Sequence, residues 1–254
     1  MKLFSRGIAV VCTTFILSLG SCSKDEEFIT EPLTDYMLVT PGKYIIYRLD
    51  STVTTDFGVE LEVHSYQVKH QVDAEITDNL GQKSYRIYRS IRNADGTGDW
   101  QPNGTYMVTD KGTSVEVVED NLRFLKLQAP IREGIEWKGN EHLPENPYAG
   151  LGFNIAVVDY MKNWDYYYST FDPVIEVEGE IYNDVFTVEQ EDLVDNWPVT
   201  AGVAAVNIRA YEQYAKNIGL VHRSHTILEY DPNSSGSTAT FSGFAVEMWM
   251  IDHN

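Results

Sequence analysis

His222 and His225 stand three residues apart, a spacing at which two imidazoles can bind one zinc ion if the segment is helical. Residues three apart share a face of a helix but point to opposite faces of a strand. The segment that follows Gly219 is typical of a strand, so we expect no metal site there. His70 lies on the apolar face of an alternating segment and is predicted to be a hydrogen-bonded core residue.

Acidic side chains are numerous, 38 in all, so close carboxylate pairs are expected by number alone and no spacing singles out a catalytic one. Residues 93–99 have the polar composition of a calcium loop. An EF-hand with Gly96 at its sixth position, however, would begin at Ile91 and end at Pro102, and neither is a ligand. We expect a hairpin turn instead. The nucleophile elbow, the phosphate loop and the dinucleotide fingerprint are missing from the sequence. We therefore predict no catalytic residue, no cofactor and no metal.

The densest aromatic group comprises Trp137, Trp164, Tyr166, Tyr167 and Tyr168. Consecutive residues of a strand point to opposite faces, so some of these rings should be exposed or line a cleft. Exposed rings can stack on sugars or anchor a protein partner. The alternative is that they pack in the core. These five residues are the predicted ligand-binding residues.

The elements that position these side chains are expected to be β-strands. Residues 66–77 alternate strictly between apolar and polar side chains, which predicts a long strand with one buried face. Hairpin turns are expected at residues 78–81 and 93–98. Further strands are expected at residues 44–49, 85–91, 105–110, 113–119, 122–128, 171–177, 181–189, 203–215, 220–230 and 238–251. The pattern predicts an all-β fold, an antiparallel β-sandwich or a curved half-barrel, with at most one short helix around residues 150–163.

The N-terminal segment indicates export. Lys2 and Arg6 precede an apolar run at residues 8–19, which is shorter than the about 20 residues of a membrane-spanning helix and has the length of a signal-peptide core. The run ends in Leu-Gly-Ser-Cys at residues 19–22, which resembles the lipobox of bacterial lipoproteins. The resemblance implies cleavage before Cys22 and acylation of that residue. An ordinary cleavage site that leaves Cys22 a free thiol is the alternative.

An acylated Cys22 anchors the chain to a membrane, because two or more acyl chains bind a bilayer stably. We expect a signal peptide at residues 1–21, the acylated Cys22 with an acidic tether at residues 22–37, and one β-rich domain at residues 38–254. Residues 23–27, Ser-Lys-Asp-Glu-Glu, resemble the surface-export signal of Bacteroidota lipoproteins. The resemblance implies the outer membrane, either exposed at the cell surface or in the inner leaflet.

Residues 178–186 and 214–221 also resemble blocks in Bacteroidota lipoproteins of unassigned function, which implies an all-β body and no particular activity. Removal of residues 1–21 takes away two basic residues and no acidic one, so the net charge changes from −19 to −21. Such a chain is repelled by nucleic acid. Cys12 leaves with the signal and Cys22 is lipidated, so no intramolecular disulfide is expected.

Three functions remain open. The first is a non-catalytic binding or assembly module at the outer membrane that contacts a glycan, lipid or protein through residues 137–171. The second is a carrier of an apolar ligand in a half-barrel, which a cavity above about 300 Å³ favours. The third is a carboxylate-dependent hydrolase, which requires two carboxyls in a cleft, one with a raised pKa.

Overall fold

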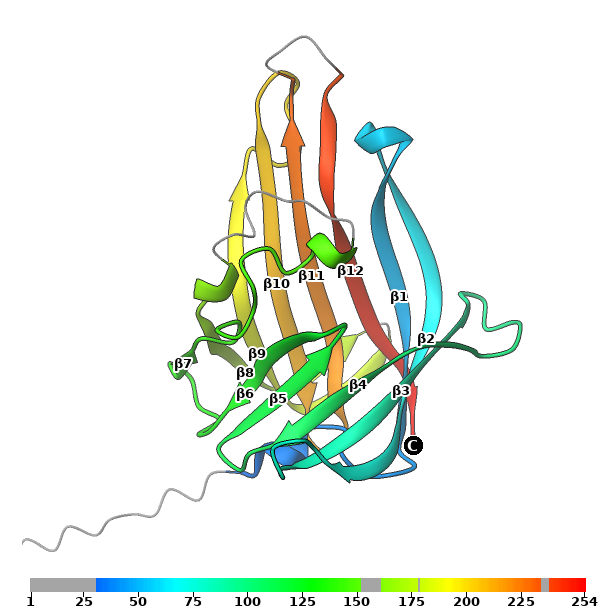
Figure 1. The fold of residues 1–254 in the computed structure, drawn as a ribbon, viewed down its shortest axis with the longest axis vertical. Coiled ribbons are helices and arrows are strands. Elements are labelled where there is room, and N and C mark those ends of the chain that lie inside the picture. Colours follow the sequence, from blue (N-terminus) through cyan, green and yellow to red (C-terminus); the bar gives the residue numbers. More distant parts are fainter. Residues whose placement is uncertain (1–30, 152–160, 178, 234–237) are drawn as a thin grey trace, which may run out of the picture.

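The computed structural model describes residues 31–151, 161–177, 179–233 and 238–254. Within these residues, twelve strands form one antiparallel sheet that curls into a nearly closed barrel, which confirms the all-β prediction and selects the half-barrel over the sandwich (Figure 1). The strands are β1 (Tyr44–Thr55), β2 (Glu60–Thr77), β3 (Lys83–Asn93), β4 (Gln101–Asp110), β5 (Ser114–Glu119), β6 (Leu122–Gln128), β7 (Glu136–Trp137), β8 (Tyr166–Val177), β9 (Glu180–Asp195), β10 (Ala205–Ala215), β11 (Gly219–Asp231) and β12 (Thr240–His253).

The order of the strands follows the sequence except at one junction. The sheet runs β6-β5-β4-β3-β2-β1-β12-β11-β10-β9-β8-β7, so the first strand pairs with the last and the two edges are the consecutive strands β6 and β7. Figure 1 shows β9–β12 with β1 and β2 as a tall curved wall, while β3–β6 cross in front of its lower half. The concave face of the wall therefore surrounds the interior.

The seam between the two edges is closed by individual contacts rather than by a ladder. The backbone N–H of Leu125 on β6 donates to the carbonyl oxygen of Gly139 (2.7 Å), and Trp137 Nε1 donates to the carbonyl oxygen of Leu125 (2.8 Å). The hydroxyl of Tyr168 on β8 donates to the carbonyl oxygen of Gln128 (2.6 Å). Aromatic side chains thus provide most of the bonding that joins the sheet edges.

One end of the barrel is closed by a 3-10 turn, η1 (Leu33–Tyr36). Leu33 and Tyr36 are buried in the core, and the rings of Tyr36 and Phe186 lie 4.6 Å apart between centroids. These residues belong to the segment expected as tether. Leu33 and Tyr36 instead belong to the packed body, because their side chains cover apolar residues at the end of the barrel.

The structure extends most of the predicted strands by a few residues. The alternation at residues 66–77 is observed in β2, with a bulge between Val72 and Ala74. The turn at residues 93–99 is a hairpin between β3 and β4, as predicted, and the backbone N–H of Thr97 donates to Asp95 Oδ1 (2.9 Å).

The region expected to hold a short helix contains a 3-10 turn, η3 (Ala149–Leu151), and helical turn geometry again at residues 161–163. Residues 152–160 lie outside the described residues, as do Cys22, the predicted signal peptide and residues 23–30. Among the residues that the structure describes, no helical segment has the length and apolar character needed to cross a membrane.

Candidate functional site

A cavity of about 330 Å³ lies within the half-barrel. One wall consists of apolar side chains from neighbouring strands: Leu49 and Val53 on β1, Val68 on β2, and Phe244, Val246 and Met248 on β12. The register explains the wall, because Met248 pairs with Leu49 and alternate residues of β12 point inward. Phe244, Val246 and Met248 therefore share the inward face of β12.

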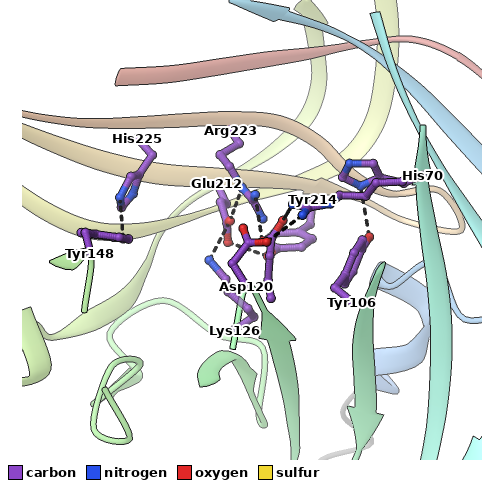
Figure 2. A network of polar contacts seen from close by, with 11 residues as sticks. His70, Tyr106, Asp120, Lys126, Tyr148, Glu212, Tyr214, Arg223 and His225 are labelled. Atoms are coloured by element: carbon purple, nitrogen blue, oxygen red, sulfur yellow. Dashed lines mark hydrogen bonds and ion pairs between the residues drawn. The ribbon is translucent and has the colours of Figure 1, made fainter. Parts of the chain in front are cut away.

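The part of the cavity next to this wall is lined by a layer of charges, here called the ion layer, in which Arg223 on β11 pairs across strands with Met248 on β12 (Figure 2). Its centre is Glu212 on β10, whose side chain is 1% exposed. Glu212 Oε1 accepts hydrogen bonds from Lys126 Nζ (2.8 Å) and Arg223 Nε (2.7 Å), and its Oε2 accepts one from the hydroxyl of Tyr214 (2.7 Å). Burial alone raises the pKa of the Glu212 carboxyl, but Lys126 and Arg223 outweigh burial and bring the pKa to about 2.

The ion layer continues toward β3 and β5. Arg223 Nη1 lies 3.5 Å from Glu119 Oε2, and Arg89 Nη1 donates to Glu119 Oε1 (2.6 Å). Arg89 Nη2 donates to Asp120 Oδ1 (2.8 Å) at the rim. Burial raises the pKa of the Glu119 carboxyl, and the two guanidiniums more than offset this and lower it. Every carboxylate at the cavity floor is therefore ion-paired.

Two histidines flank the ion layer as neutral imidazoles. His70 Nδ1 lies 3.1 Å from the hydroxyl of Tyr106, and His225 Nε2 lies 3.1 Å from the hydroxyl of Tyr148. Burial lowers the pKa of each to about 3. The prediction that His70 is a hydrogen-bonded core residue is confirmed.

The predicted separation of His222 and His225 on opposite faces of a strand is also confirmed. His225 lines the cavity, whereas His222 lies on the other face of β11, where its Nε2 is 2.6 Å from Glu247 Oε1. Among the described residues, no group of three or more His, Cys, Asp or Glu side chains is arranged to hold a metal ion.

Most of the predicted aromatic residues pack in the core, which is the alternative that the sequence left open. Trp137, Trp164, Tyr166 and Tyr168 are between 0% and 8% exposed, and only Tyr167, at 40%, points outward. The physical reason is the seam: β6 and β8 are not joined by a ladder, so large rings fill the space between them. Trp137 packs against Tyr168 with centroids 4.9 Å apart. Of the five, Tyr166 lines the cavity, and its hydroxyl donates to Asn140 Oδ1 (2.8 Å).

The charged side chains of the ion layer were not singled out from the sequence. A signal was present, because Lys126 is in phase with Leu122 and Phe124 on β6, and Glu212 is in phase with Ala210 and Tyr214 on β10. A charged residue on the apolar face of an alternating strand must find a buried partner. The partner cannot be named from the sequence, since Lys126 and Glu212 are 86 residues apart.

The fold and cavity define an antiparallel half-barrel with an amphipathic interior.

No family model matches the chain, and no curated protein matches it either. Among solved structures, an exported protein with a YmcC-like fold from Bacteroides fragilis is similar at 11% identity and a TM-score of 0.40, over 85% of this chain and 99% of that one. LprF from Mycobacterium bovis is similar at 12% identity and a TM-score of 0.22, over 84% and 85% of the two chains. A DUF1329 family protein from Desulfovibrio piger is similar at 13% identity and a TM-score of 0.19, over 85% of each chain. Likenesses at these values assign neither a family nor a function.

Proposed function

We propose that this chain is a non-catalytic binding lipoprotein of the bacterial envelope that holds an apolar or amphipathic small molecule in its half-barrel. The observation that carries the proposal is the cavity of about 330 Å³, with an apolar wall on β1 and β12 and a polar floor at the ion layer. Small-molecule sites have volumes of about 300–1,000 Å³, apolar walls and a few polar groups that orient the ligand.

The chemistry of the floor favours binding over hydrolysis. A glycosidase general acid is a carboxyl whose pKa is raised so that it keeps a proton near neutral pH. The pKa values of Glu119 and Glu212 are both lowered by their cationic neighbours. Likewise, the lowered pKa values of His70 and His225 make these imidazoles weak bases. The described cavity thus supports a receptor for a ligand rather than a site for acid–base chemistry.

The place of the protein follows from the predicted acylation of Cys22. Residues 23–32 would connect the lipid to η1 at the closed end of the barrel, and the β1–β2 hairpin lies at the far end (Figure 1). The barrel would then stand with its closed end toward the bilayer, at the outer membrane. A glycan or protein partner stays a prediction, and Tyr167 is the one predicted aromatic residue exposed to meet it.

The test measures binding of an uncharged, polarity-sensitive dye, N-phenyl-1-naphthylamine. The protein used is residues 23–254, produced without the predicted lipid anchor. This segment contains every described strand and the core. We expect the dye to bind with enhanced fluorescence, and Val246→Trp to weaken binding at least about tenfold because the indole fills the cavity. Ala245→Trp is the matched control, since Ala245 is the next residue of β12 and points to the other face.

Two results would contradict the proposal. The first is a combination of two findings: the folded protein does not bind the dye, and mass spectrometry detects no lipid in the protein isolated from membranes. The other is equal binding by the wild type and Val246→Trp, which places the dye outside the cavity.

A further inference from the structure

The polar side of the cavity holds two hydrogen-bond donors that are buried and have no acceptor in the described part of the chain. They are Nε2 of Gln190 and Nε of Arg89, and both residues line the cavity. Gln190 is only 3% exposed. A buried donor without an acceptor loses its hydrogen bonds to water and gains nothing in return. Both atoms would be satisfied by oxygen acceptors on a bound molecule.

The position of Gln190 places its amide beside the ion layer. Gln190 lies at the register shift between β9 and β10, where Glu189 pairs with Tyr211 and Glu191 pairs with Ala210. Gln190 and Glu212 both line the cavity.

The unsatisfied donor of Arg89 favours an anion as the ligand. Three cations line the cavity, Arg89, Lys126 and Arg223, whose side chains are 8–18% exposed. Two of the three carboxylates that pair with them, Glu119 and Glu212, are similarly buried, at 16% and 1%. The third, Asp120, is 44% exposed at the rim and pairs with Arg89. The three cations and three carboxylates balance in number, but the unsatisfied Nε of Arg89 is a donor on a cation, and its hydrogen bond to an anionic oxygen is stronger than one to a neutral oxygen.

We propose that the ligand is an amphiphile whose head carries an anionic oxygen acceptor, as a carboxylate or a phosphate does. This inference rests on the proposed function and specifies its ligand class. The head accepts a hydrogen bond from Gln190 Nε2 at the edge of the ion layer. The apolar tail lies against the wall formed by Val53, Phe244 and Val246.

The test compares three amphiphiles with the same tail, dodecanoate, dodecanol and dodecylammonium, as competitors for N-phenyl-1-naphthylamine on residues 23–254. We expect dodecanoate to displace the dye at a concentration about tenfold lower than dodecanol, since a hydrogen bond to a charged group discriminates by about that factor. Gln190→Leu should reduce this preference to about twofold or less. Gln190→Glu should reverse the order, so that dodecylammonium binds best. A comparison of dodecyl phosphate with dodecanoate then shows whether a phosphate or a carboxylate head binds more tightly.

The control is Gln213→Leu, because Gln213 lies on β10 but on the other face, where its side chain contacts His222 and Thr187. This variant should keep the preference for dodecanoate, and circular dichroism checks that each variant is folded. The inference is wrong if dodecanol competes as well as dodecanoate, or if Gln190→Leu and Gln190→Glu both keep the wild-type order. Its failure is distinct from that of the proposed function, since in those cases the dye and dodecanol still bind. If the dye does not bind, calorimetry with dodecanoate gives the answer directly, and no heat of binding contradicts both.

Discussion

Glu212→Gln tests whether the ion layer stabilises the fold as the geometry implies. The change keeps the size of the side chain but leaves Lys126 and Arg223 without their shared carboxylate, in a place where Glu212 is 1% exposed. Removing one partner of a buried ion pair costs about 3–5 kcal/mol. The pKa of the Glu212 carboxyl, about 2 against an ordinary 4.5, independently corresponds to about 3 kcal/mol. We therefore expect a loss of about 3 kcal/mol at pH 7.

The same pKa fixes how this loss depends on pH. The carboxyl has a lower pKa in the folded state, so its contribution is complete at pH values above about 4.5 and disappears as the pH falls toward 2. The difference in the free energy of unfolding between the wild type and Glu212→Gln should thus be constant from pH 7 to pH 5. It should shrink between pH 4 and pH 3.

Urea unfolding followed by tryptophan fluorescence measures both effects, provided that the slope with urea is unchanged. Glu75→Gln is the control, because Glu75 is 53% exposed and pairs with Lys83 at the surface (3.0 Å), where an ion pair contributes about 0–1 kcal/mol. A loss below about 1 kcal/mol for Glu212→Gln, or one that does not change down to pH 3, would refute the reasoning. Adding Lys126→Met should recover part of the loss, since one unpaired cation is then removed.

Three other predictions concern the seam and the anchor. Gly139→Ala should cost about 1–3 kcal/mol in urea unfolding, because a Cβ there would lie 2.3 Å from the buried ring of Tyr166; unchanged stability contradicts this packing. Trp164→Ala should cost about 3–5 kcal/mol and Tyr167→Ala less than about 1 kcal/mol, and equal losses would contradict their placement in the core and on the surface. Cys22→Ser should abolish labelling by radioactive palmitate and release the chain from membranes, whereas labelling that persists would contradict acylation at this residue.

The strands were predictable because a half-buried strand records its two faces in alternate residues. β2 and β12 are the clearest cases, and the observed burial follows the predicted faces. The pairing of β1 with β12 was not predictable, because it joins residues some 200 positions apart and neither strand carries a mark of its partner. Pairings between neighbours are local and follow from hairpin turns. The closing of the sheet depends on the pairing of β1 with β12, which does not follow from a hairpin turn.

The aromatic residues show a pattern that gave the correct faces but left their environment open between the core and the surface. Alternation at residues 166–168 correctly places Tyr167 on one face and its two neighbours on the other. Which face is solvent depends on the seam, where Leu125 and Gly139 meet across the sheet edges. No periodicity reports such a contact.

The ion layer explains why the cavity can exist beside a packed core. Apolar side chains around an empty volume tend to collapse into it, because filling a void gains contacts. Charged groups resist that collapse, since covering the guanidiniums of Arg89 and Arg223 with apolar atoms removes their remaining hydration without supplying acceptors. The layer also joins the two halves of the sheet across the interior, from Lys126 on β6 to Glu212 on β10 and from Glu119 on β5 to Arg223 on β11. Since the seam has no ladder, these bonds hold β5 and β6 against the wall at a fixed distance. The ion layer therefore maintains the width of the cavity and presents the polar surface that a ligand head would meet.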